Sequence, residues 1–331
     1  MCKIQYKNSC EITAKLVKQV KEQESILEVD KTRMNEVKAK IRVEKDARNE
    51  RKVESIRQSL DESKRKLFDA TSEHGASHWL NCIPLKCYDF HLEKQSFRDA
   101  LFLRYGIPLK RLPLKCVCGA NFDEIHGLNC ATGGFTTIRH NEIRDLTAEL
   151  LNEVCNDVSS EPLLTPLTGE NFVFKSTTTD DEARLDISAR GFWARGSKAF
   201  FDVRVFNPLA KSYSKQPITT VYRNIEKSKK SKYNERIIRT ENGSFTPLIF
   251  SCFGGIGIEG KRFYKRLFDT IADKRDEKPY LVSNLLRTKI SMSLVRSCLL
   301  CLRGSRSIRK NQLSTPVVDM DLRLAAVQSQ I

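Results

Sequence analysis

Residues 11–68 contain neither glycine nor proline, the two residues that most often interrupt a helix. The stretch is dense in Lys, Glu and Arg. Apolar residues recur in it every seven positions, in one phase at Val20, Leu27, Met34 and Ile41, and in a shifted phase at Val53, Leu60 and Leu67. This pattern predicts a long helix or short coiled coil over residues 1–72, with a phase break near Arg48. A solvated single helix is the alternative, because charged residues fill much of the apolar seam.

Charge and cysteine content narrow the class of protein. The chain of 331 residues has a formal net charge of +16, which favours a polyanionic partner and most often nucleic acid. A basic protein of ribosomal style is the alternative. Its 11 cysteines are an odd number in a long chain, and the N-terminal residues lack the apolar core of a signal peptide. We therefore expect reduced thiols and a nuclear or cytoplasmic location. No apolar run reaches transmembrane length, so we expect no membrane partner.

After residue 72 the residue composition and the predicted secondary structure change several times along the chain. Aromatic residues and proline-bearing turns predict a helical linker over residues 73–113, and a Cys/His-rich segment follows over 114–135. Apolar spacing then predicts helices at 136–155, 219–239, 259–273 and 280–302, and strands at 171–175, 183–190, 199–206 and 245–253. This order predicts a mixed α/β domain over 136–303, in which helix 219–239 is a crossover between strands. Residues 304–331 read as a flexible tail with a short helical end.

Four metal-ligating residues fall within one short segment. They are Cys116, Cys118, His126 and Cys130. Three thiolates and one imidazole suit a closed tetrahedral zinc site that stabilises a small element without its own core. Gly119 and Gly127 each follow a ligand, where tight loops need a permissive backbone. His140 could replace one ligand, and buried free thiols are the alternative because Cys-x-Cys is tighter than the common spacing.

Two predicted strands each contain one aspartate within an apolar run. Asp186 alternates with Leu185 and Ile187, and Asp202 alternates with Phe201 and Val203. A buried carboxylate is costly unless it finds a partner, and two such carboxylates commonly share a metal ion. If the strands form a hairpin, we expect both side chains to meet near one end of the sheet, where Mg²⁺ or Mn²⁺ could activate water on a phosphodiester. Salt bridges to neighbouring arginines are the alternative for each aspartate taken singly.

The order of these motifs resembles a known family. Arg184-Leu-Asp186 followed by Asp202-Val-Arg204 on the next strand is similar to the PD-(D/E)XK nuclease pattern. The Cys-Cys-His-Cys knuckle, RHNEIRD (139–145) and the two aspartate strands, in that order, resemble the restriction-like endonuclease region of non-LTR retrotransposon polyproteins. The resemblance spans about residues 77–306 and implies a restriction-endonuclease-like core, a mixed sheet flanked by helices. The chain contains no Tyr-x-Asp-Asp, so reverse transcriptase activity is not expected, and a truncated or domesticated remnant of such an element fits this content.

The resemblance assigns catalytic roles to particular positions. Asp186 and Asp202 match the two metal-binding acids of the pattern, with Leu185 in place of the usual proline. Arg204 stands where lysine is expected, and it can stabilise charge but cannot act as a base. Lys229 in the predicted basic helix is therefore the candidate for a relocated catalytic cation, with Lys230 second.

Two further expectations follow from the resemblance and the charge. The family often has an acid in the first helix, and Glu142 or Glu149 could supply it. Four basic residues of the helix 219–239 would contact phosphates: Arg223, Lys227, Lys230 and Lys232. The sequence thus predicts a metal-dependent DNA endonuclease with structural zinc. An inactive nucleic-acid-binding protein and a protein that self-associates through its N-terminal helix are the alternatives.

Overall fold

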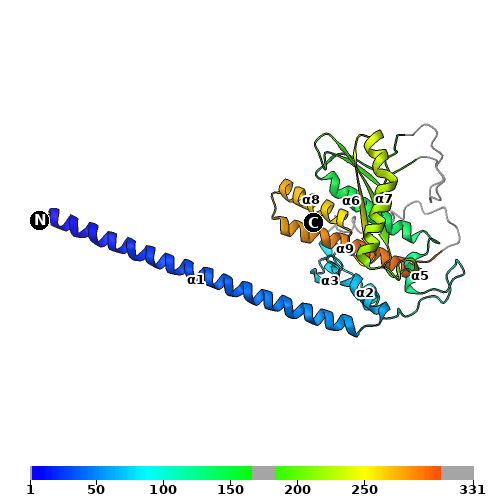
Figure 1. Ribbon diagram of the computed structural model, residues 1–331, viewed down its shortest axis with the longest axis horizontal. Coiled ribbons are helices and arrows are strands. Elements are labelled where there is room, and N and C mark those ends of the chain that lie inside the picture. The colour runs from blue at the N-terminus through cyan, green and yellow to red at the C-terminus, as the bar shows by residue number, and fades with distance from the viewer. Residues whose placement is uncertain (1, 166–182, 307–331) are drawn as a thin grey trace. The chain divides into compact units, whose positions relative to one another are not determined.

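The computed structural model describes residues 2–165 and 183–306 (Figure 1). Contacts divide the chain into two compact units, Met1–Asp61 and Glu62–Ile331. The first unit is one continuous α-helix, α1 (Cys2–Ser59). It runs through Arg48 without interruption, so the predicted phase break does not end the helix, and the end falls at Ser59 instead. Apolar side chains that are exposed along it include Val20, Met34, Val37, Ile41, Val43, Val53 and Ile56.

The second unit is built on a four-stranded mixed sheet with the order β1-β2-β3-β4. Its strands are β1 (Asn156–Ser160), β2 (Ile187–Arg190), β3 (Lys198–Phe206) and β4 (Ser244–Ser251). The first three pair antiparallel, whereas β3 and β4 pair parallel. The parallel pair is joined through α7 (Ile218–Thr240), as the sequence predicts for a crossover helix.

The sequence analysis missed one strand of this sheet. β1 reads NDVSS, and such a polar segment carries no apolar alternation that would predict a strand. It lies at the edge of the sheet, where it pairs with β2 and its Val158 packs against the main core. The strand predicted at 171–175 lies outside the described residues.

Helices cover both faces of the sheet (Figure 1). On one face, α6 (Phe135–Asn152), α8 (Ile258–Arg275) and α9 (Pro279–Arg303) enclose the main core around Phe201, Val203 and Leu248. On the other face, α7 packs Val221, Tyr222 and Ile225 against Phe206 and Ile249. Because side chains alternate along β3, the residues between Phe201 and Val205 are divided between these two layers. The fold is therefore the predicted mixed α/β class, with a sheet flanked by helices.

Short helices precede this layered core. They are α2 (Glu62–Ser72), α3 (His78–Asn81), the 3₁₀ turn η1 (Lys86–Tyr88), α4 (Lys94–Tyr105) and α5 (Glu124–Asn129), and η2 (Lys211–Tyr213) follows β3. Trp79, Phe90 and Ala100 pack with Met292 and Leu299 of α9. The segment predicted as a linker is thus packed into the second unit. α2 belongs there too, which moves the boundary from residue 72 to Asp61/Glu62. No described helix is both long enough and apolar enough to span a membrane.

Candidate functional site

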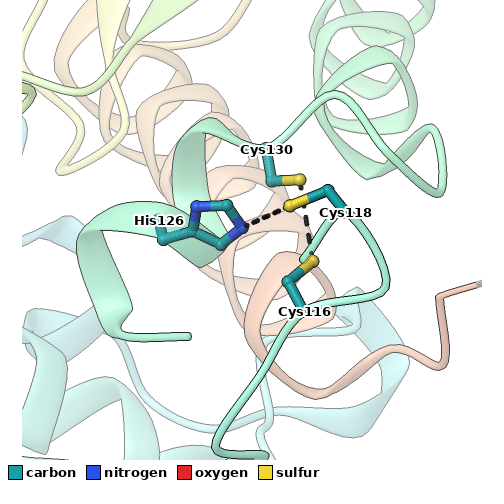
Figure 2. Close-up of side chains that lie close together, drawn as sticks. All are labelled: Cys116, Cys118, His126 and Cys130. Atoms are coloured by element: carbon teal, nitrogen blue, oxygen red, sulfur yellow. Dashed lines mark hydrogen bonds between the residues drawn. The ribbon is translucent and has the colours of Figure 1, made fainter. Parts of the chain in front are cut away.

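The four predicted zinc ligands converge (Figure 2). The ligand atoms of Cys116, Cys118, His126 and Cys130 all lie within 4.8 Å of one another. The Sγ atoms of Cys116 and Cys130 are 3.8 Å apart, and Cys118 Sγ is 3.4 Å from His126 Nε2. Tetrahedral zinc with bonds of about 2.3 Å to sulfur and about 2.0 Å to nitrogen separates its ligands by roughly 3.5–3.8 Å. The cluster can therefore hold a metal ion such as zinc.

Local backbone structure sets the positions of these ligands. Cys116 and Cys118 lie on a tight loop closed by the Lys115–Asn121 bridge and by the bond from Gly119 N to Cys116 O. Gly119 adopts a φ of 89°, as predicted for a permissive turn position. Gly127 differs, because it lies inside α5 and a Cβ there would be 2.8 Å from Leu302 Cδ2. That glycine is required for close packing, not for a left-handed turn.

Helix α5 presents His126 and fixes the knuckle to the rest of the second unit. The carboxylate of Asp123 caps the helix by accepting a hydrogen bond of 2.6 Å from His126 N. Arg306 Nη2 donates to the main-chain oxygens of Gly127 and Cys301, at 2.8 and 2.7 Å. The knuckle therefore packs on α9. His140, the alternative zinc ligand, lies elsewhere.

Asp186 and Asp202 meet across the β2–β3 hairpin. The last pair in the register is Ile187 with Phe201, so one further antiparallel step places Asp186 opposite Asp202. Asp202 is only 6% exposed, and its side chain lies on the α7 side of β3. Lys229 of α7 donates to Asp202 Oδ1 at 2.9 Å, and its Nζ is 2.8 Å from Oδ2 in a geometry outside that of a hydrogen bond. The structure thus brings together three residues that the sequence analysis selected as catalytic candidates.

Asp186 is held from the other side by α6. Its Oδ2 accepts a bond of 2.5 Å from the main-chain N–H of Val203 and lies 3.1 Å from His140 Nε2. The same imidazole nitrogen is 3.0 Å from the carbonyl oxygen of Val203. His140 is therefore the α6 residue that reaches the aspartate pair. Its place in RHNEIRD, at the start of a helix before an acidic strand, is the only sequence signal that could have indicated it.

The electrostatics of this group reflect burial and close opposite charges. Burial raises the pKa of Asp202, Lys229 opposes that rise, and the nearby Asp186 carboxylate adds to it. Burial opposes protonation of His140, but its contacts with Asp186 outweigh this effect and raise the pKa of the imidazole. Burial and the charges of Asp202 and Asp186 also raise the pKa of Tyr233. The site is thus a compact, partly desolvated set of interacting charges.

Other predicted site residues lie away from this pair. Arg204 is exposed and donates to the hydroxyl of Tyr213 at 3.2 Å. Glu149 is exposed on α6, nine residues after His140, and therefore on the opposite side of that helix. Glu142 is partly buried, and its pKa is raised by burial and by Asp145. In the part of the chain that the structure describes, neither glutamate contacts the aspartate pair.

The predicted phosphate-contacting residues of α7 differ in whether another side chain already contacts them. Arg223 and Lys227 are exposed, and Lys232 lies 4.7 Å from the centre of the Tyr233 ring. Lys230 forms a salt bridge of 3.0 Å with Glu259. These four residues remain candidates for phosphate contact.

The tip of the β2–β3 hairpin contributes to packing. Trp193 donates to Thr246 Oγ1 at 3.1 Å and packs against the main core, so it caps the sheet.

Comparison with known proteins leaves the family open. No protein-family model matches the chain, and no curated protein matches its sequence. Across residues 2–165 and 183–306, no group of three or more His, Cys, Asp and Glu side chains other than the Cys116 cluster brings its ligand atoms together to hold a metal. The class that follows from the structure is a mixed α/β domain that carries a Cys₃His cluster able to bind a metal such as zinc.

Proposed function

We propose that this chain is a metal-dependent DNA endonuclease, related to the restriction-like endonuclease region of non-LTR retrotransposon polyproteins. The observation that carries the proposal is the position of Asp186 opposite Asp202 at the end of the β2–β3 pairing, together with the contact of Asp202 with Lys229 of α7. A mixed sheet flanked by helices, preceded by a Cys-Cys-His-Cys knuckle, is the core that this resemblance implies.

The residues around the aspartates suit a hard divalent cation such as Mg²⁺ or Mn²⁺. Asp202 Oδ2 is buried and accepts no hydrogen bond. Asp186 Oδ2 and the carbonyl oxygen of Val203 both lie within hydrogen-bond distance of His140 Nε2. Carboxylate and carbonyl oxygens are the ligands that such cations prefer. A cation bound by Asp186 and Asp202 would activate water and neutralise charge on the phosphodiester.

The protein side chains would supply the remaining chemistry. Lys229 would release part of its contact with Asp202 when a cation binds, and its ammonium group would then stabilise negative charge on the scissile phosphate. His140 would position Asp186 through the bond between Nε2 and Oδ2. Arg204 would act on more distant phosphates, since its side chain is directed to Tyr213.

The knuckle and α7 would bind the nucleic acid. Zinc at Cys116, Cys118, His126 and Cys130 would hold the knuckle rigid, and the exposed residues Arg223, Lys227 and Lys232 would contact phosphates along α7. Such contacts make affinity depend steeply on salt. We place this activity in a reducing compartment, nuclear or cytoplasmic, because thiols ligate the zinc.

Nicking of supercoiled plasmid by the full chain tests the proposal. We expect nicking with Mg²⁺ or Mn²⁺ that stops in EDTA and is lost in Asp202→Asn and Asp186→Asn. Arg239→Gln is the matched control, because it removes an exposed charge of α7 at a residue that neither touches the aspartates nor belongs to the proposed phosphate contacts. Nicking that persists in both aspartate variants would refute the site.

A nucleic-acid-binding protein without catalysis is the second candidate. The observation that favours it is the contact of the Lys229 ammonium group with both carboxylate oxygens of Asp202, a position in which lysine can take the place of a cation. This candidate predicts salt-dependent DNA binding that is weakened by Lys227→Gln, with no nicking in any metal.

A further inference from the structure

A second cluster of basic side chains lies outside the aspartate site. A pocket in the second unit is lined by His74, His78, Lys261, Arg287 and Ser291, with Gly254 among its main-chain walls. His74 lies between α2 and α3, His78 opens α3, Lys261 lies on α8, and Arg287 and Ser291 lie on α9. Three separate parts of the fold therefore direct donor groups into one pocket.

The cations of this pocket form no salt bridge with the residues that the structure describes. Neither Lys261 nor Arg287 forms a salt bridge there, and no carboxylate lines the pocket. Glu73 interacts electrostatically with Lys261, and its Oε2 accepts a hydrogen bond of 3.0 Å from the Tyr222 hydroxyl. Burial raises the pKa of Glu73 to about 7, so this carboxyl is protonated at lower pH and offsets part of the positive charge only as the pH rises above 7.

The glycine-rich turn GGIGIEG (254–260) forms part of the wall of this pocket. Gly75 and Gly254 both adopt left-handed backbone, with φ of 102° and 99°. A Cβ on Gly75 would be 3.2 Å from the oxygen of Gly254, and a Cβ on Gly254 would be 3.0 Å from Ala76 Cα. The two glycines let the segment after α2 approach the turn before α8, and this approach closes one side of the pocket.

The arrangement favours an anion over a metal. The rings of His74 and His78 lie edge to face with their centroids 6.0 Å apart. They do not belong to any converging group of three or more metal-ligating side chains in the described residues. Ser291 Oγ accepts from Trp79 N at 3.2 Å, which leaves its hydroxyl hydrogen free to donate.

We propose that this pocket binds a phosphate group, as inorganic phosphate or as the phosphate of a nucleotide or nucleic acid. Arg287 supplies a planar donor pair, Lys261 a mobile point charge, and Ser291 a neutral donor, which together suit the several oxygens of a phosphate. The proposal does not depend on the aspartate site.

Protonation supports this assignment. Burial and the charge of Arg287 lower the pKa of both His74 and His78. A bound dianion reverses the repulsion from Arg287 and Lys261, so the histidines take up protons as it binds. Glu73 would change in the same direction, because its protonation also favours an anion. We therefore expect sulfate, which does not titrate in this range, to bind more tightly at pH 6 than at pH 8.

The test is calorimetric titration of the full chain with inorganic phosphate, with Arg287→Gln beside the wild type. We expect about a tenfold or greater loss of affinity in Arg287→Gln, the range for a charge-assisted hydrogen bond. Lys289→Gln is the matched control: it removes a positive charge from α9 at a residue that does not line the pocket. Lys261→Gln provides a second, exposed variant in case Arg287→Gln does not fold.

Each outcome decides the proposal. Loss confined to the two pocket variants supports it, whereas equal loss in Lys289→Gln, or no phosphate binding by the wild type, overturns it. The affinity that Arg287→Gln loses for oligonucleotides with and without a 5′-phosphate separates the sources, because contacts along α7 are the same in this variant and the wild type. A larger loss for the phosphorylated end indicates a terminal phosphate, an equal loss for both indicates the phosphodiester backbone, and a loss for inorganic phosphate alone indicates a free anion. Retained nicking in Arg287→Gln distinguishes failure here from failure of the proposed nuclease site.

Discussion

Replacing Lys229 with methionine removes the positive charge that acts most strongly on the buried Asp202. At 2.9 Å and an effective dielectric constant near 20, the gross attraction between the two charges is about 6 kcal/mol, most of which offsets their desolvation. Methionine keeps much of the volume of the lysine stem and leaves the carboxylate without its counter-ion. Loss of one partner of a buried pair costs about 3–5 kcal/mol.

Protonation of Asp202 limits this cost. Neutralising an ordinary carboxyl at pH 7 requires about 4 kcal/mol, and at pH 5 only about 1.5 kcal/mol. We therefore expect Lys229→Met to lower the free energy of unfolding by about 3 kcal/mol at pH 7 and by about 1 kcal/mol at pH 5.

The direction in which stability changes with pH follows from the raised pKa of Asp202. The folded state retains the proton to higher pH than the unfolded state, so the stability that this group contributes is present at low pH. It is lost as pH rises through the folded pKa. Removal of Lys229 raises that pKa further and extends the loss to higher pH.

Tryptophan fluorescence during urea unfolding measures this effect selectively. Both tryptophans, Trp79 and Trp193, lie in the second unit, so the signal excludes α1. The measurements are made at pH 5 to 8 without added Mg²⁺ or Mn²⁺, so that neither cation binds at Asp186 and Asp202.

Two further variants test the cause. Lys227→Met removes an exposed charge from the same helix, and we expect a change within about 0.5 kcal/mol. Adding Asp202→Asn to Lys229→Met should remove the pH dependence of the stability loss that Lys229→Met causes. A loss in Lys229→Met that is the same at pH 5 and pH 8 would refute the assignment to the unpaired carboxylate.

Further predictions concern the knuckle, Glu73 and α1. Cys116→Ser should abolish binding of one equivalent of zinc, measured by metal analysis, and lower the melting temperature, whereas Cys87→Ser, an exposed free thiol, should retain the metal. Glu73 has a folded pKa of about 7, raised by burial, so its contribution of about 3 kcal/mol is present below pH 4 and is lost as pH rises to about 7. Glu73→Gln should therefore flatten the stability profile between pH 5 and 7, and an unchanged slope would contradict this. Deletion of residues 1–61 should abolish any concentration-dependent increase in mass in sedimentation, because exposed apolar residues of α1 offer the contact surface. A shortened chain that still self-associates would place the contact in the second unit.

Several elements could be predicted from the sequence because their determinants are local. The lack of glycine and proline predicts α1, apolar alternation predicts β3 and β4, and Cys/His spacing predicts the metal cluster. The sequence pattern did not predict where the first helix ends. It ends at Ser59, and α2 begins as a separate, packed helix at Glu62. Lys229 was also selected from the sequence, as the candidate for a relocated cation in the predicted basic helix, and the structure places its ammonium group 2.9 Å from Asp202 Oδ1.

Other features required the tertiary structure, because they depend on contacts between residues far apart in the chain. His140 meets Asp186 and Val203 only after α6 packs on the sheet, and β1 is a strand only because β2 pairs with it. The basic pocket likewise joins His74, Lys261 and Arg287, which no local pattern connects. The sequence by itself determined the long helices, the central strands and the Cys₃His cluster through periodicity and ligand spacing. Only the folded chain decided which charges are buried together, since burial and distance between remote residues set their partners and their pKa values.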